Sequence, residues 1–171
     1  GNRYYASLWV DGVKMNFTKA KEFILALEKL VDNRYDPLGP YTHAVHETFF
    51  FDKVIGNFNF WGMKVPRNWT GKILEVTTHE YIDNKDIKIV DKFVDFESID
   101  QSFQHYDNTI KRLYKDAYEL RFMANAFLEK LVDSDEDKEF KWATAKNYDK
   151  LLKIRYCQVM NEEFQYSLIK D

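Results

Sequence analysis

Residues 44–48 read AVHET, and this stretch decides how the rest of the chain is interpreted. Apolar positions around it predict a helix that begins near residues 41–42 and runs to about Ile55, with Gly56 as its stop. Glu47 is set among apolar and aromatic residues, and such surroundings disfavour the charged form of a carboxyl group. A carboxylic acid that keeps its proton near neutral pH is what a general acid requires. The stretch therefore predicts a helix that carries an acid.

A second carboxyl lies on a separate element. Residues 73–82 and 87–94 are rich in β-forming residues, and the turn residues 83–86 between them predict a β-hairpin. Glu80 falls on the first strand, within the segment THEY at 78–81. From there it can face Glu47 across a cleft. Two carboxyls that face each other across a sugar-binding groove are the usual arrangement for glycoside hydrolysis.

The remaining segments are mostly helical. Ser98 and Gln101 form a capping box that predicts the start of a helix. The expected order is a short strand or hairpin at 4–14, a helix from the cap Thr18, a break at 36–40, the helix at 41–55, an irregular loop at 57–72, the hairpin, and helices from Ser98, at 118–132 and from the cap Thr144. This order predicts one α+β domain over residues 1–171 that is mainly helical and has a small β-hairpin lobe.

Composition excludes several classes of protein. The 171 residues are 45% hydrophobic and carry a net charge of -3, so the chain is neither disordered nor the basic type expected of a sequence-independent nucleic-acid binder. The single cysteine, Cys157, excludes an internal disulfide framework and a cysteine-rich metal site. No apolar run approaches the roughly 18 residues that span a bilayer. Aromatic residues reach 17%, and these can either fill a core or line a sugar-binding cleft.

Five segments in order resemble the family 73 glycoside hydrolases, which are bacterial and phage peptidoglycan N-acetylglucosaminidases with a lysozyme-like fold. The resemblance runs from about residue 17 to 158. The family's Ala-x-x-Glu-Ser-Gly, Asn-x-Phe-Gly-Ile-Lys and Thr-x-Glu-Tyr segments match residues 44–48, 59–64 and 78–81. Its Phe-Arg-x-Tyr-x-Ser with Ser-Phe-x-x-Tyr, and its Tyr-Ala-Thr-x-x-x-Tyr followed by Leu, match residues 93–106 and 142–151.

The resemblance implies a role for each matched position. Glu47 takes the place of the general acid. Glu80 takes the place of the second carboxylate on a mobile β-lobe, which either activates water or is partly replaced by the 2-acetamido group of the substrate. The implied substrate-binding residues are Asn59, Trp61, Tyr81, Trp142 and Tyr148. Of the aromatic residues, Trp61, Tyr81, Trp142, Phe50 and Phe60 are the candidate sugar platforms, and Phe23, Phe103, Tyr106, Phe122 and Phe127 are the expected core.

The chain departs from the family pattern at two places. Residues 48–51 read TFFF where the family has Ser-Gly-Trp-Gly, which predicts a bulkier floor of the cleft. Trp142 stands where the family has a tyrosine near the scissile sugar, so the phenolic hydroxyl is missing there.

The function that these features favour is hydrolysis of the β-1,4 bond between N-acetylglucosamine and N-acetylmuramic acid in peptidoglycan. Three alternatives stay open: a lytic transglycosylase on the same fold, a non-catalytic cell-wall-binding or phage tail module, and a helical protein with an aromatic core. No metal or cofactor is expected. His43 and His46 lie one helical turn apart and can in principle bind zinc, but packing or solvent exposure is the favoured interpretation.

The expected partner is the peptidoglycan glycan strand, and neither nucleic acid nor a membrane span is expected. Such a protein acts at the cell wall, secreted or associated with a phage, although no signal peptide is visible in this chain. Peptidoglycan-degrading proteins are often basic, because the wall carries anionic polymers. The net charge of -3 therefore indicates delivery by a wall-targeting module or by a larger phage or secretion assembly.

Overall fold

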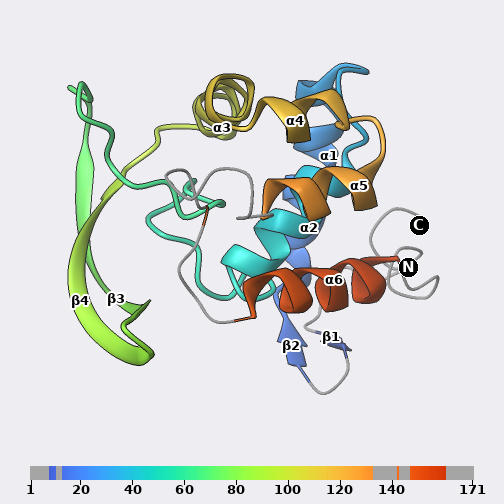
Figure 1. Ribbon diagram of the computed structural model, residues 1–171. Helices are drawn as coiled ribbons and strands as arrows, with labels where there is room; N and C mark the ends of the chain where they lie inside the picture. The colour runs from blue at the N-terminus through green and yellow to red at the C-terminus, as the bar shows by residue number, and fades with distance from the viewer. Residues whose placement is uncertain (1–7, 11–12, 133–141, 143–146, 161–171) are drawn as a thin grey trace.

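The computed structural model describes residues 8–10, 13–132, 142 and 147–160 (Figure 1). In these residues the helices form one body, and a long curved hairpin extends from it (Figure 1). The strands are β1 (Leu8–Val10), β2 (Val13–Met15), β3 (Ile73–Ile82) and β4 (Lys85–Val94), and the helices are α1 (Phe17–Val31), α2 (Leu38–Glu47), α3 (Ile99–Leu113), α4 (Lys115–Glu119), α5 (Ala124–Leu131) and α6 (Tyr148–Val159). The predicted α+β architecture, mainly helical with a small β-hairpin lobe, is confirmed.

The β3–β4 hairpin agrees with the sequence prediction. Its strands pair antiparallel from Ile73↔Val94 to Ile82↔Lys85, and the two-residue turn between them has positive φ at Asp83 and Asn84. Exposure alternates along β3, and the even-numbered residues from Leu74 to Glu80 are partly buried. Because side chains alternate between the faces of a strand, Glu80 lies on the inner face of the hairpin.

A second hairpin pairs Leu8–Val10 with Val13–Met15, within and just beyond the predicted 4–14. The predicted turn residues Asp11 and Gly12, and residues 4–7, lie outside the described residues. Asn16 rather than Thr18 caps α1, because its side chain accepts a hydrogen bond from the backbone N–H of Lys19.

The capping box at Ser98 is confirmed as the start of α3, with Ser98 accepting from the N–H of Gln101. The prediction of one continuous helix over 118–132 is wrong in one respect, because the helical structure is interrupted between Glu119 and Ala124. At the interruption, the carbonyl of Arg121 accepts a hydrogen bond from the N–H of Asp36. The predicted cap Thr144 lies outside the described residues.

Aromatic side chains fill the centre of the helical body. Trp61 stacks on Tyr106 with ring centroids 4.1 Å apart, and Phe23 packs against Phe60 at 4.4 Å. Of the expected core residues Phe23, Phe103, Tyr106 and Phe127 are buried, which confirms four of the five. The fifth, Phe122, is 56% exposed, because it lies in the interruption between α4 and α5.

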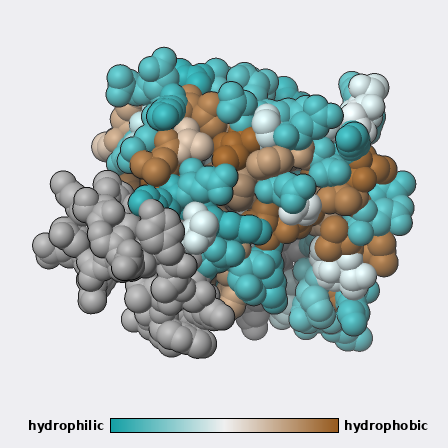
Figure 2. Space-filling model, turned by 180° about the vertical axis from the view of Figure 1, so that it is seen from behind, coloured by the Kyte–Doolittle hydropathy of each residue, from teal (hydrophilic) through white to brown (hydrophobic). Residues whose placement is uncertain are grey.

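The exposed apolar residues are dispersed. Seen from behind, they come to the surface in separate patches among hydrophilic residues (Figure 2). No helix in the described part of the chain is both long and apolar enough to cross a membrane.

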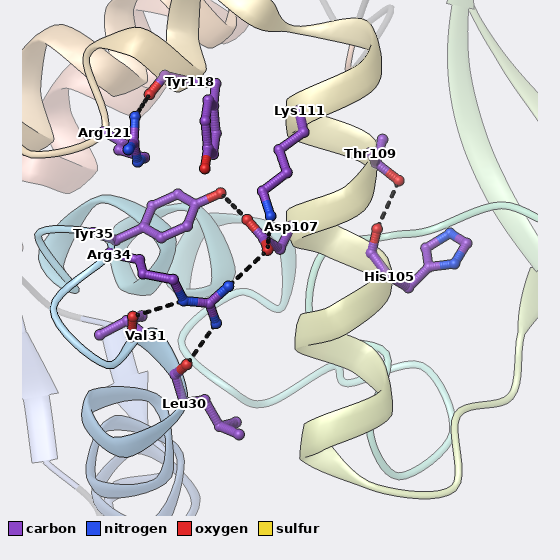
Figure 3. Close-up of polar contacts among 10 residues, drawn as sticks. All are labelled: Leu30, Val31, Arg34, Tyr35, His105, Asp107, Thr109, Lys111, Tyr118 and Arg121. Carbon is purple, nitrogen blue, oxygen red and sulfur yellow. Dashed lines mark hydrogen bonds and ion pairs between the residues drawn. The ribbon is translucent and has the colours of Figure 1, made fainter.

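A buried carboxylate joins α1 to α3. Asp107 on α3 is almost fully buried and accepts hydrogen bonds from the Tyr35 hydroxyl at 2.7 Å and from Arg34 at 3.2 Å (Figure 3). Lys111 pairs with the same carboxylate at 3.0 Å. Arg34 also donates to two carbonyls at the end of α1. Burial, together with the hydrogen bond to Asp107, raises the pKa of Tyr35, so its phenol keeps its proton and remains a donor. This network links the end of α1 to α3.

Helix α2 differs from the prediction at both ends. It begins at Leu38 rather than near residue 41, since Gly39 and Pro40 fit into its first turn, where the backbone N–H groups are not needed within the helix. It ends at Glu47 rather than at Ile55. The early end leaves Glu47 at the C-terminus of the helix.

Three consecutive residues after α2 have left-handed backbone conformations. The φ angles of Phe49, Phe50 and Phe51 are 49°, 59° and 63°. Such a run costs roughly 1–2 kcal/mol per residue for L-amino acids. Full burial of the rings of Phe50 and Phe51 offsets this cost. The Thr48 hydroxyl adds two bonds, donating to the carbonyl of Ala44 and accepting from the N–H of Phe51.

Substitutions in this left-handed turn should have unequal effects on stability. Phe50→Ala is expected to lower the free energy of unfolding by about 3–5 kcal/mol, because it empties a fully buried site. Phe49→Gly should change it by less than about 1 kcal/mol, since glycine accepts positive φ freely and the ring of Phe49 is 41% exposed. Urea unfolding of both variants measures the difference. Equal losses at the two positions would contradict this account of the turn.

Candidate active site

A cavity of about 510 Å³ lies between the helical body and the β3–β4 hairpin. Glu47 and Gly62 contribute to its wall from the helical side, and Glu80 contributes from the hairpin. The sequence stretches around 44–48, 59–64 and 78–81 thus meet at one place, as the prediction of a cleft between two carboxyls required. Trp142 and Tyr148 also line this cavity.

Glu47 has only neutral polar partners among the contacts that the described residues make. Its Oε1 atom accepts a hydrogen bond from the hydroxyl of Tyr148, and Nε2 of His43 lies 3.7 Å from the same oxygen. The side chain of Glu47 is 19% exposed. Within the described ranges, no Lys or Arg nitrogen lies within ion-pair distance of this carboxyl.

The neighbours of Glu47 are held in their uncharged forms. Burial lowers the pKa of His43, and this effect outweighs the opposing attraction of Glu47. Burial likewise lowers the pKa of His46 to about 4, with a smaller contribution from Arg155 in the same direction. Burial and the negative charge of Glu47 both raise the pKa of Tyr148, so its phenol remains a donor. The Nδ1 atom of His43 is already engaged with the Tyr106 hydroxyl at 2.9 Å.

The second oxygen of Glu47 faces a glycine. Gly62 has a φ of +64°, and a Cβ atom at this position would lie 3.0 Å from Oε2 of Glu47. Because glycine lacks that atom, the backbone can lie close to the carboxyl without covering it. Oε1 therefore contacts Tyr148, whereas Oε2 lies beside the backbone of Gly62.

Glu80 has a different environment. Its Oε1 atom accepts a hydrogen bond from Nζ of Lys64 at 2.7 Å, and Lys64 also pairs with Asp91 at 2.8 Å. Partial burial opposes the charge of Lys64, but its bonds to Asp91 and Glu80 outweigh burial and raise the pKa of Lys64. Asp91 also loses hydration, yet Lys64 holds the pKa of Asp91 below its usual range. The hairpin side of the cavity therefore carries charged groups.

The structure places the predicted substrate-binding residues in two groups. Trp142 and Tyr148 line the cavity together with Glu47 and Glu80. The indole N–H of Trp142 donates to the carbonyl of Trp61 at 3.1 Å. Trp142 stands where the resembling family has a tyrosine, and its indole is held by this hydrogen bond to a backbone carbonyl.

Asn59, Trp61 and Tyr81, for which cleft-lining positions were predicted, are not among the residues that line this cavity. Asn59 is buried and bonds the backbone of Met63 and the carbonyl of Val94, which fixes the loop. Trp61 is fully buried, and its N–H donates to the carbonyl of Pro40. Tyr81 follows Glu80 on β3, and alternation points it to the opposite face.

The phenylalanines 49–51 and 60 also differ from the prediction. Phe50, Phe51 and Phe60 belong to the buried core, and none of them lines the cavity. They are therefore neither a bulky floor nor sugar platforms. The left-handed turn directs the rings of Phe50 and Phe51 away from the cleft.

Several residues of the site were not assigned from the sequence. Gly62 and Lys64 lie within the motif segment 59–64. That segment indicates that they belong to the site, but it does not indicate what either residue does there. Asp91 and Tyr114 had no local signal, because Asp91 approaches Lys64 only through strand pairing and Tyr114 lies in the cavity wall after α3.

Several solved structures share this fold. A peptidoglycan hydrolase mutant from Sphingomonas sp. A1 superposes with a TM-score of 0.69 at 21% identity, over 88% of this chain and 99% of that one. The glycoside hydrolase domain of FlgJ from Salmonella typhimurium gives 0.58 at 19% identity, over 82% and 97%. The catalytic domain of the autolysin Auto from Listeria monocytogenes gives 0.58 at 20% identity, over 87% and 88%. The chain is similar to these proteins in fold.

No protein-family model matches the sequence, and no curated protein matches it either. The shared fold agrees with the resemblance to the family 73 glycoside hydrolases.

The lowered pKa of His46 predicts a pH dependence of stability. The unfolded chain takes up this proton near pH 6.5, whereas the folded protein takes it up only near pH 4. Unfolding therefore binds a proton between these values, so stability falls as the pH drops from 6.5 towards 4. At pH 5 the loss should reach up to about 2 kcal/mol. His46→Gln and His46→Phe should both reduce this slope in urea unfolding at pH 7 and 5. An unchanged slope in both variants would disprove the assignment.

Proposed function

We propose that this chain is a glycoside hydrolase that cleaves the β-1,4 bond between N-acetylglucosamine and N-acetylmuramic acid in peptidoglycan, with Glu47 as the general acid. The observation that carries the proposal is the position of Glu47. It lies in the wall of a cavity, at the C-terminal end of a helix where the dipole disfavours negative charge, and its neighbours are neutral. The shared fold with peptidoglycan hydrolases supports the substrate.

Under this proposal the two oxygens of Glu47 have different tasks. Tyr148 binds Oε1 and orients the carboxyl group. Oε2 faces Gly62 and is the oxygen that gives its proton to the glycosidic oxygen. As the bond from C1 to that oxygen breaks, an oxocarbenium-like sugar forms. A water molecule held by Glu80 then attacks C1 and releases a proton to the carboxylate.

Two other functions are alternatives that the experiment below distinguishes from hydrolysis. A lytic transglycosylase needs the acid alone, and the paired carboxylate Glu80 across the cavity favours hydrolysis over it. A non-catalytic wall-binding or phage tail module needs neither carboxyl. Under the proposal the protein acts at the cell wall, and delivery by a wall-targeting module or a larger phage or secretion assembly agrees with the net charge of -3.

Digestion of purified peptidoglycan with mass analysis tests the proposal. The wild-type protein should release fragments with reducing N-acetylglucosamine ends, each carrying the elements of one added water. Glu47→Gln should slow release by about 10²–10⁴-fold, because the amide cannot give up a proton. Glu75→Gln is the matched control, because Glu75 lies exposed on the outer face of the same strand as Glu80.

The products separate the alternatives. Anhydro ends, which lack one water, would identify a lytic transglycosylase. Binding to sacculi without any released fragment would identify a non-catalytic module. Full activity of Glu47→Gln would disprove the role of Glu47.

Gly62→Ala tests the open side of Glu47. The added Cβ meets Oε2 and also adopts an unfavourable positive φ, so activity should fall at least about tenfold. Gly56→Ala is the control, since Gly56 has a similar φ of +59° but its Cβ would meet Leu74 and Asp95 instead. Both variants should lose roughly 1 kcal/mol of stability or more, and only Gly62→Ala should lose activity at temperatures where both are folded. Equal losses of activity would show that strain, and not access to Oε2, is responsible.

A further inference from the structure

Lys64 connects the loop that carries Gly62 to the β3–β4 hairpin. The segment 63–65 runs beside β4: Lys64 forms a bridge with Phe93, the N–H of Val65 donates to the carbonyl of Lys92, and the N–H of Val94 donates to the carbonyl of Met63. These bonds attach the loop that carries Gly62 to the edge of the hairpin.

Strand register places the side chain of Lys64 on the face that carries Glu80. Lys64 pairs with Phe93, and Phe93 pairs with Leu74 in β3. Leu74 and Glu80 lie an even number of positions apart in β3, and so do Phe93 and Asp91 in β4. Because side chains alternate along each strand, Lys64, Glu80 and Asp91 all project to the inner face. The ammonium group of Lys64 bridges the two carboxylates at 2.7 and 2.8 Å.

We propose that Lys64 is a positioning residue, which holds Glu80 in place and in its ionised form across the cavity from Glu47. This inference rests on the proposed function. Lys64 does not touch the reacting atoms in this account; it acts through Glu80. The role is one that the cavity requires, because a carboxylate that activates water must carry its charge when the substrate is bound.

Asp91 is the second carboxylate that Lys64 contacts. Without a cation, Glu80 and Asp91 would be two carboxylates on one face, and like charges in such proximity disfavour ionisation of one of them. With Lys64 between them both keep their charge, and the ammonium cannot turn away from the hairpin without losing two ion pairs. Within the part of the chain that the structure describes, the titratable groups around Glu80 include His79 on β3, with Asp86 3.5 Å from it, and Glu47 and His46 across the cavity.

The test compares Lys64→Met with Lys64→Arg in two measurements. Carbon-13 NMR of the side-chain carboxyls follows the titration of Glu80 directly and needs no activity. The pH profile of kcat/KM on peptidoglycan fragments follows the same group during turnover. In Lys64→Met, Glu80 should titrate at higher pH, and at a pH below the whole acid limb kcat/KM should fall about tenfold for each unit by which that limb moves. At pH 8 the loss should be much smaller, and KM should change little.

Lys64→Arg should restore the wild-type titration, because it supplies a cation at the same position. Lys92→Met is the matched control: it removes one positive charge from the adjacent, exposed position, and it should leave both measurements unchanged. Asp91→Asn should move the acid limb to lower pH or leave it in place, since Lys64 then serves Glu80 alone.

Two outcomes would overturn the inference. The first is an unchanged NMR titration of Glu80 in Lys64→Met, whatever the activity. The second is a raised KM with an unshifted pH profile, which would make Lys64 a substrate contact instead. If the wild-type protein shows no activity at all, the proposed function fails, and the NMR titration still decides whether Lys64 controls the charge of Glu80.

Discussion

The site depends on one constraint, which is that helix α2 must end at Glu47. If the helix continued to Ile55, Glu47 would lie in the middle of a cylinder and the following phenylalanines would be spread around it. Instead residues 49–51 adopt left-handed backbone conformations, and the rings of Phe50 and Phe51 are buried in the core. The unfavourable backbone persists because the buried rings and the Thr48 hydroxyl stabilise it. The result is a carboxyl fixed at a helix end, beside a cavity.

Most helices and strands of the fold can be predicted from the sequence, because they follow from local periodicity and capping. The hairpin at 73–94 and the cap at Ser98 are examples. The left-handed turn cannot be predicted from the sequence, because nothing local distinguishes it from helix. Phenylalanine is rare at positive φ, and only the packing around Phe50 and Phe51 stabilises that backbone conformation. The carboxyls of the site were predicted from their segments, and they do meet at one cavity.

The direction in which each side chain of the site points could not be predicted in the same way. Trp61 and Trp142 are both aromatic residues in motif segments, yet one is fully buried on Tyr106 and the other lines the cavity. This distinction is set by tertiary packing. The link between Lys64 and Asp91 likewise exists only once the loop has paired with β4. Sequence therefore predicts which segments form the site more reliably than which atoms face the ligand.

The two walls of the cavity differ in a way that suits two opposite roles. On the helical side, burial suppresses the charge of His43 and His46, and Tyr148 contributes a neutral donor. On the hairpin side, the ammonium of Lys64 keeps its charge because two carboxylates surround it. One carboxyl thus faces neutral groups and the other a cation, and pairs of titratable groups in contrasting environments are how one site supplies both an acid and a base. Since the loop of Gly62 and Lys64 contacts both walls, a movement of the hairpin that displaced Glu80 would also disturb the contact between Gly62 and Glu47. Glu47 and Glu80 are therefore expected to be set in place together.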